Sequence, residues 1–345
     1  MAAGLGFGFI GAGAIANFHA RAVAAARGGR LVGVVSRRRA TAEAFAREHG
    51  IGFAGDDVGA LLAQPDLDAV CITTPSALHL EPALAAIRAG KHLMIEKPLD
   101  ATVEGTDRIL AEAEKAGVRV GSIFQARFGD ASRQLKAAID AGRFGRMVLA
   151  SCYVKWHRTA EYYTGWKGKL SEDGGGVIIN QAIHGVDLLL WFAGMPAEVF
   201  AWATQRVHRI ESEDTCVAAL RFGSGAFGTI EGTTATWPGW SRRIEICGEN
   251  GAAVMEDDDI TRWDFRVPRA EDGKIRAMRE SAAMGSGAAA PMNIRMEGHQ
   301  RQIQDFIDGI REKRPFFIEG VEARKAVVLV RAIYDSAASG KPVRL

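Results

Sequence analysis

Short apolar runs alternate with helix-like stretches over the first third of the chain, and this alternation restricts the fold more than any other feature. The runs expected to form strands are 5–10, 31–35, 67–73, 92–96 and 119–124. The stretches expected to form helices are 14–26, 41–49, 81–89 and 102–116. Strands separated by helices predict a parallel sheet with right-handed crossovers. The sequence therefore predicts a doubly wound α/β domain over residues 1–124.

After residue 124 the pattern changes to closely spaced strand-like runs. These runs are 147–156, 199–207, 215–222, 228–236 and 243–247, and the expected helices are 131–141, 179–192, 298–312 and 321–339. Short runs with few helices between them favour a mainly antiparallel sheet. We therefore expect a second, α+β domain over residues 125–345, with the Ala/Gly-rich stretch 281–291 as a mobile loop.

Composition excludes several classes of protein. Hydrophobic residues make up 48% and charged residues 24% of the 345 positions, as in a globular protein, and no apolar run reaches the length of a membrane helix. The 43 basic and 41 acidic side chains nearly cancel, which argues against binding to nucleic acid or a membrane surface. No Lys or Arg precedes Arg21, so we expect no signal peptide and a cytoplasmic protein. The cysteines are expected to be reduced core residues; they are Cys71, Cys152, Cys216 and Cys247.

A glycine-rich turn joins the first predicted strand to the first helix, in the segment GFIGAGAIANFHA. Gly11, Gly13 and Ala16 fill the three positions of the G-x-G-x-x-G/A pattern. The first glycine permits a tight turn, the second lets the backbone approach a pyrophosphate, and the small third residue packs the helix on the strand. With a strand before it and a helix after it, the pattern predicts a dinucleotide site that includes Ala14 and Ile15 at the helix start. A purely structural turn is the alternative.

Charge is distributed unevenly, and the second predicted strand ends where this matters. Residues 1–42 carry six arginines and no carboxylate, whereas the remainder carries 37 basic and 41 acidic residues. A site for NAD usually places an acid at this strand end, to bind the ribose 2′-hydroxyl. Here Ser36, Arg37 and Arg38 follow the strand instead, and they suit a 2′-phosphate. The sequence predicts NADP, with NAD possible; a solvated arginine turn is the alternative.

Polar residues also follow the third and fourth predicted strands, at the sheet edge where doubly wound domains bind ligands. Thr73, Thr74 and Pro75 could hold a ribose or phosphate. Lys97, restrained by Pro98, could donate or accept a proton, although a surface charge is the alternative.

The apolar helix 179–192 carries a polar stripe. Asn180, His184 and Asp187 are spaced i, i+4 and i+7, within roughly 60° of one helix face. Histidine suits proton transfer near neutral pH, and a carboxylate beside it can fix its tautomer. We interpret the stripe as the wall of a site, with a solvated face as the alternative. No metal is expected, because the histidines form no H-E-x-x-H or Cys/His cluster, and the acidic run 256–259 is typical of a turn.

Four segments resemble the glucose–fructose oxidoreductase / inositol dehydrogenase / MocA (Gfo/Idh/MocA) family. They are GFIGAGAIANFHA, ITTPSALHLEPALAAIRAGKHLMIEKPL, GGGVIINQAIHGVDLLLW and IYDSAASGKPV, and they span nearly the whole chain. The resemblance implies a Rossmann domain followed by an α/β domain with a large, open, mainly antiparallel sheet. That sheet is commonly the contact of a homodimer or homotetramer. The resemblance also implies hydride transfer between a nicotinamide cofactor and a hydroxyl or ketone carbon of a sugar or cyclitol.

The same resemblance implies residue roles. Lys97 is the catalytic lysine, with a cis bond to Pro98, and His184 is its acid/base partner. The expected cofactor contacts are Gly11, Gly13, Ala14, Ile15, Ser36, Arg37, Arg38, Thr73, Thr74, Pro75, His79, Glu96, Lys97, Gln125, Trp166 and Lys167. The expected substrate contacts are Lys97, Lys155, Tyr163, Asn180, His184 and Asp187.

Some residues depart from the family pattern. Many members carry Asp in place of Asn180 and Gly in place of Ala182, and the variant N-Q-x-I-H resembles branches that act on other sugars, including nucleotide sugars. Lys167 stands where some NADP-dependent members carry Arg, which keeps the charge but loses the forked donor.

The expected activity is that of an NADP(H)-preferring oxidoreductase acting on a sugar, sugar derivative or cyclitol, with no nucleic-acid or membrane partner. Alternatives within the fold are an NAD-dependent sugar or inositol dehydrogenase and a glycoside hydrolase that uses bound NAD. A cofactor-sensing regulator without turnover is an alternative from another class.

Overall fold

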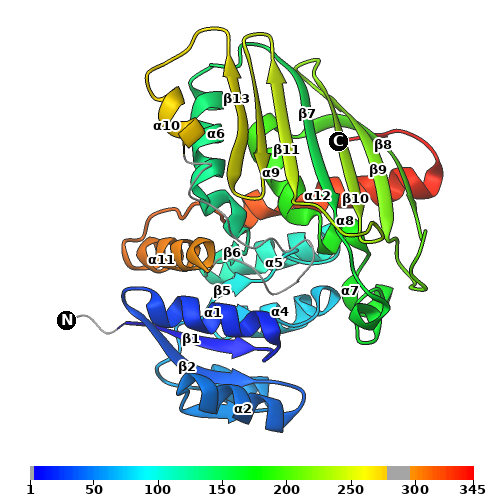
Figure 1. Ribbon diagram of the computed structural model, residues 1–345. Helices are drawn as coiled ribbons and strands as arrows, with labels where there is room; N and C mark the ends of the chain where they lie inside the picture. The colour runs from blue at the N-terminus through cyan, green and yellow to red at the C-terminus, as the bar shows by residue number, and fades with distance from the viewer. Residues whose placement is uncertain (1–3, 278–295) are drawn as a thin grey trace. The chain divides into compact units, whose positions relative to one another are not determined.

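The computed structural model describes residues 4–277 and 296–345, which form two compact units (Figure 1). The first unit comprises 4–125 and 296–327, and the second comprises 126–277 and 328–345. The predicted division at residue 124 did not anticipate that the chain returns to the first unit over 296–327. The stretch expected as a mobile loop, 281–291, lies outside the described residues.

A six-stranded parallel sheet, in the order β3-β2-β1-β4-β5-β6, forms the centre of the first unit. Its strands are β1 (Leu5–Ile10), β2 (Gly29–Val35), β3 (Phe53–Gly55), β4 (Ala69–Ile72), β5 (His92–Ile95) and β6 (Val120–Ser122). The helices of this unit include α1 (Ala14–Ala25), α2 (Arg39–His49), α3 (Val58–Leu62), α4 (Leu80–Arg88), α5 (Val103–Ala116) and α11 (Glu297–Arg311). The doubly wound prediction is confirmed, although β3, only three residues long, was not predicted.

Both faces of this sheet are buried, which explains why its strands are mainly apolar. Phe7 and Phe9 belong to one core cluster, which also contains Phe306 of α11. Ile72 and Leu84 belong to a second cluster, together with residues of α3, α4 and α5. Each such side chain contributes about 1.5–3 kcal/mol when fully removed from water. Helices on both faces therefore hold the strand ends in fixed positions.

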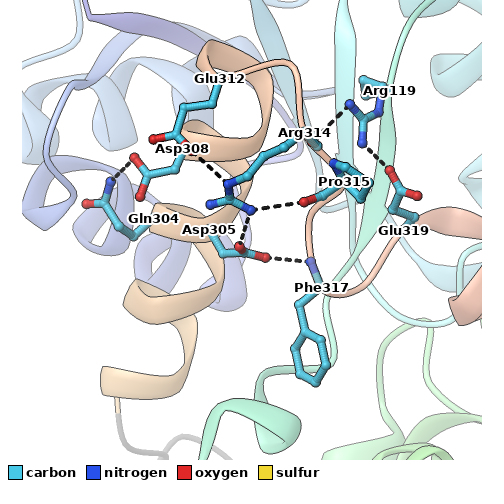
Figure 2. A network of polar contacts seen from close by, with 9 residues as sticks. All are labelled: Arg119, Gln304, Asp305, Asp308, Glu312, Arg314, Pro315, Phe317 and Glu319. Carbon is cyan, nitrogen blue, oxygen red and sulfur yellow. Dashed lines mark hydrogen bonds and ion pairs between the residues drawn. The ribbon is translucent and has the colours of Figure 1, made fainter.

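The returning segment between α11 and α12 (Gly320–Ser339) is held to the first unit by the polar network in Figure 2. Arg314 donates to Asp305 at 3.1 Å, and Arg119 donates to the carbonyl oxygen of Arg314 at 3.2 Å and also pairs with Glu319. An antiparallel bridge joins Glu319 to Gly121 of β6. The returning chain therefore covers the edge of β6, whose backbone groups would otherwise be available for pairing with another strand.

An eight-stranded sheet, in the order β13-β12-β11-β7-β10-β9-β8-β14, dominates the second unit. Its strands are β7 (Met147–Lys155), β8 (Pro196–Thr204), β9 (Thr215–Phe222), β10 (Phe227–Thr233), β11 (Arg243–Gly248), β12 (Gly251–Glu256), β13 (Asp259–Phe265) and β14 (Val343–Arg344). Its helices include α6 (Asp130–Asp140), α7 (Leu170–Asp173), α8 (Val177–Asn180), α9 (Ile183–Ala193) and α10 (Asp272–Ala277). Strands β7 and β10 pair in parallel and the other neighbours are antiparallel, so the predicted mainly antiparallel sheet is confirmed. The acidic run 256–259 lies at the β12–β13 turn, as predicted.

The helix predicted over 179–192 is wrong in its continuity. Helix α8 ends at Asn180 and α9 begins at Ile183. The backbone N–H of Ala182 donates to the carbonyl of Val177, five residues back, which interrupts the regular ladder. The apolar pattern runs through the break, so periodicity did not reveal it.

In the described part of the chain, no single helix is long and apolar enough to cross a membrane. One pair of helical segments, Leu170–Asn180 with Ile183–Ala193, meets the length and composition criterion, but it is bent by 50°.

Glu213 is a buried carboxylate at which three segments of the second unit meet. It accepts hydrogen bonds from the backbone N–H of Gly176 at 2.9 Å and of Ile178 at 3.0 Å, and from the Tyr334 hydroxyl at 2.9 Å. Burial raises the pKa of Glu213 to about 7, because the loss of hydration outweighs these donors. Its protonation is therefore linked to the stability of this unit.

We expect Glu213 to make stability fall as pH rises from 4.5 to about 7, because the folded state keeps a proton that the unfolded state has lost. The loss should approach about 3 kcal/mol of unfolding free energy. Urea unfolding across this pH range should show a smaller loss in Glu213→Gln, and an unchanged loss in the exposed control Glu271→Gln. Equal pH dependence in wild type and Glu213→Gln would contradict this prediction.

Candidate active site

The glycine-rich loop after β1 is pressed against the end of β4. Gly11 has a φ of +107°, and a Cβ atom there would lie 2.7 Å from the Thr73 carbonyl oxygen. Thr73 also donates from its hydroxyl to the carbonyl oxygen of Gly11 at 3.0 Å. Only glycine satisfies both the conformation and the close approach. The position therefore needs the residue that the sequence pattern predicted.

Gly13, by contrast, borders open space. A Cβ atom there would meet no heavy atom of the described chain within 4 Å. Helix α1 begins at the next residue, Ala14, and within the described residues no side chain caps it. Its first backbone N–H groups and the positive end of its dipole therefore suit an anion, and the missing Cβ leaves room for a phosphate.

A second observation in the first unit also fits a nicotinamide dinucleotide. The side-chain oxygen of Gln125 is buried and has no hydrogen-bond partner among the residues described. A buried acceptor of this kind is costly unless a donor reaches it, and a carboxamide N–H₂ group is such a donor. The glycine loop would hold the pyrophosphate of the cofactor, and Gln125 would hold its nicotinamide end.

Exposed cations follow β2. Arg37 and Arg38 are exposed, and Arg39 pairs with Glu43 at 3.0 Å. The first turn of α2 contains no acid. This strand end therefore presents positive charge where a carboxylate would bind a ribose hydroxyl.

His79 connects the loops that follow β4 and β5. Its two ring nitrogens lie 2.9 Å from the carbonyl oxygen of Pro98 and 3.1 Å from that of Thr74. The ring is fully buried, and burial lowers the pKa of His79. The peptide bond between Lys97 and Pro98 is cis, as predicted. His79, an expected cofactor contact, thus supports the two loops with its ring.

Glu96 is likewise committed to protein partners. One carboxylate oxygen lies 2.6 Å from Nε2 of His19, and the other accepts the backbone N–H of Lys97 at 3.0 Å. Burial by itself raises the pKa of Glu96, but the His19 hydrogen bond and the charges of His19 and Lys97 outweigh it and lower the pKa to about 2. The carboxylate expected to contact the cofactor is therefore also hydrogen-bonded within the protein.

The polar stripe of the second unit is not a solvated face. Asn180 is buried and donates to Asp173 at 2.5 Å, and Asp173 also accepts the backbone N–H of Gly168 at 2.8 Å. His184 is the partly exposed member of the stripe. Asn180 and His184 are thus held at the α8–α9 break, where the local ladder is irregular.

Asp187 does not present a free carboxylate to a substrate. Its two oxygens accept from Arg127 at 2.8 and 2.7 Å, and both side chains are 1% exposed. A buried carboxylate needs such a partner, because its removal from water is costly. The predicted substrate contact is therefore a residue whose carboxylate Arg127 already holds. Arg127 was missed in the sequence, since its partner lies 60 positions away.

Tyr162 was also missed. Its hydroxyl oxygen lies 2.5 Å from Nζ of Lys167 and accepts from the side chain of Gln181 at 3.0 Å. Burial raises the pKa of Tyr162, but the charges of Lys167 and Arg158 outweigh it and lower the pKa. Lys167 also lies 5.0 Å from the ring of Trp166, so this predicted pair is adjacent in space.

Two other predicted substrate contacts lie in different surroundings. The Tyr163 hydroxyl bonds that of Thr234 at 2.8 Å, and burial raises the pKa of Tyr163 to about 12. Lys155 pairs with Glu231 at 2.7 Å. In β7, the neighbouring residue Val154 packs toward α9, so alternation directs Lys155 to the opposite face of the sheet. The structure therefore separates Lys155 from Asn180 and His184.

Among the residues described, no group of three or more His, Cys, Asp or Glu side chains is arranged to hold a metal ion. The cysteines lie in strands and form no disulfide, with Cys71, Cys152 and Cys216 buried and Cys247 partly buried.

Comparison with known proteins gives consistent matches along the chain. Residues 5–124 match the oxidoreductase family with an NAD-binding Rossmann fold, and residues 132–254 match the GFO/IDH/MocA C-terminal domain. The chain is 31% identical to 1,5-anhydro-D-fructose reductase of Ensifer adhaerens, over 88% of this chain and 92% of that protein. It is 27% identical to inositol 2-dehydrogenase of Rhizobium meliloti, over 98% of each.

A solved structure agrees over the full length. The WlbA dehydrogenase from Bordetella pertussis, in complex with NADH and UDP-GlcNAcA, has a TM-score of 0.91 and 33% identity. The match covers 100% of this chain and 99% of that one. The chain described here therefore belongs to the Gfo/Idh/MocA family of NAD(P)-dependent oxidoreductases.

Proposed function

We propose that this protein is an NADP(H)-preferring oxidoreductase that acts on a hydroxyl or ketone carbon of a sugar, sugar derivative or cyclitol. The observation that carries the proposal is the glycine loop, in which Gly11 is required by the backbone and Gly13 leaves room for a phosphate. The substrate class is supported by the relatives, whose names include an anhydrofructose reductase and inositol dehydrogenases.

The residues of this chain would have the following roles in catalysis and binding. When bound, the nicotinamide ring supplies or accepts the hydride. Lys97 exchanges a proton with the substrate hydroxyl oxygen, and His184 assists as a second acid/base group. Asn180 and Tyr163 hold substrate hydroxyls. The oxygen of Gln125 would accept from the carboxamide, and Trp166 with Lys167 would make a further cofactor contact.

Replacing Lys97 with methionine tests the acid/base assignment. We expect kcat to fall by about 10²–10⁴-fold, because general acid/base catalysis contributes that much. Binding of NADPH, measured by fluorescence titration, should stay within about threefold of wild type. The exposed control Lys115→Met should keep full activity. A kcat within about tenfold of wild type in Lys97→Met would refute the assignment.

Substitution of the exposed arginines after β2 tests the cofactor preference. The double variant Arg37→Ala/Arg38→Ala should lower kcat/KM for NADP about tenfold or more relative to NAD, because the 2′-phosphate loses its charged partners. Arg39→Ala, whose side chain already pairs with Glu43, is the matched control. The NADH in the WlbA structure makes NAD the second candidate. A wild-type preference for NAD above about tenfold would overturn the proposal.

We also propose that the protein forms a homodimer or homotetramer through the face of its large sheet that points away from α8 and α9. Cross-strand pairing places four exposed apolar side chains on this face, namely Leu149, Trp202, Val217 and Phe227. Trp202 is 64% exposed and Phe227 is 59% exposed. Large exposed apolar patches mark interaction surfaces.

Charged residues on this face should weaken the assembly. Trp202→Asp/Phe227→Asp is expected to shift the mass measured by light scattering toward the monomer. The control Val267→Asp changes an exposed apolar residue outside this sheet and should leave the mass unchanged. A wild-type monomer at micromolar concentration would disprove the proposed interface.

A further inference from the structure

The contact between His19 and Glu96 joins the cofactor-binding helix to the residue proposed as the proton donor. His19 lies on α1, which begins immediately after the glycine loop, and Glu96 follows β5 directly. His19 is 1% exposed and the side chain of Glu96 is 9% exposed, and their closest atoms are 2.6 Å apart. The second oxygen of Glu96 holds the backbone N–H of Lys97 at 3.0 Å. A single carboxylate thus links α1 to Lys97.

The groups that interact with the Glu96 carboxylate are positively charged or neutral. His19, Lys97 and His299 interact with it as positive partners, and the ring of His299 lies edge-on to that of His19 at 5.3 Å. Burial raises the pKa of the Cys71 thiol and lowers the pKa of His79, so these two neighbours are held neutral. A second carboxylate, Asp100, interacts with His79. The field that Lys97 experiences from this side therefore depends on Glu96.

Stability alone gives little reason for this arrangement. Burying a carboxylate and its hydrogen-bond partner costs both groups their hydration, and well-packed apolar residues often serve the core equally well. A charge that interacts with Lys97, however, favours the ammonium form of that residue. The carboxylate also fixes the peptide from which the lysine side chain extends.

We propose that Glu96 and His19 are positioning residues that set the pH at which Lys97 gains or loses its proton. This inference rests on the proposed function of Lys97. His19 keeps the buried carboxylate charged and oriented. The negative charge of Glu96 then stabilises the ammonium form of Lys97. The pair would tune the lysine without touching substrate.

The test is a carbon-13 NMR titration of labelled lysine side chains, which needs neither substrate nor turnover. The Lys97 signal is assigned by its loss in Lys97→Met. In Glu96→Gln, which keeps the shape but removes the charge, we expect the midpoint to move to lower pH by about one unit. In a separate kinetic measurement, the pH profiles of kcat/KM should shift in the same direction. These are the rising limb for substrate oxidation and the falling limb for substrate reduction.

Matched variants separate this role from packing. His19→Gln can still donate to Glu96 and should shift the Lys97 midpoint less than His19→Leu does. The control His49→Gln, whose ring bonds Asn17 of α1 at 2.7 Å, should leave the midpoint unchanged. If Glu96→Gln fails to fold, the two His19 variants carry the test.

An unchanged Lys97 midpoint in folded Glu96→Gln would overturn the inference and leave the pair a structural contact. If Glu96→Gln does not fold, an unchanged midpoint in folded His19→Leu would do the same. The proposed function fails separately, when Lys97→Met retains turnover. A shifted midpoint with an active Lys97→Met would support the electrostatic link while removing its catalytic meaning.

Discussion

The alignment of parallel strand ends determines where the chemistry of the first unit can lie. Ile10, Ile72 and Ile95 are paired across β1, β4 and β5. The residues that follow two of them continue the ladder, because the N–H of Thr73 donates to Ile10 and that of Glu96 donates to Ile72, each at 2.9 Å. The chain directions alone therefore bring three loops to one edge of the sheet. They are the glycine loop after β1, the loop after β4 that begins at Thr73, and the loop after β5 that contains Lys97.

Buried charge is the second constraint. Glu96 and Asp187 are both removed from water, and each is paired with a residue distant in sequence, His19 and Arg127 respectively. Such pairs contribute little net stability, yet removing one partner leaves an uncompensated charge that is strongly destabilising. They therefore fix the position of segments that otherwise share few regular hydrogen bonds. In the first unit, this places the constraint next to Lys97.

The sequence predicted those site residues whose positions depend on their neighbours along the chain. Gly11 was identified because a strand, a tight turn and a helix leave a recognisable spacing, and Lys97 because it follows a strand end. The cis bond before Pro98 came from the family resemblance and is present. The face occupied by Lys155 was also within reach, because alternation along the strand directs it away from Val154.

Contacts between residues far apart in the sequence could not be predicted from such local patterns. Nothing near Arg127 in the sequence indicates that Asp187 is its partner, and an apolar helix pattern does not show that hydrogen bonds shift at Ala182. The contact between His19 and Glu96 spans 77 positions, so it too became visible only in the folded chain. The protein partners of Asp187 and Glu96 could therefore not be predicted from the sequence.

The measurement that most directly tests the account is absorbance at the reduced-nicotinamide band during turnover. The protein would be mixed with NADP⁺ and a panel of sugars, sugar derivatives and cyclitols, and in the reverse direction with NADPH and keto-sugars. The account predicts net formation or loss of reduced cofactor in step with product. Product formed without any net change in that band would contradict it and indicate a reaction that regenerates its own cofactor.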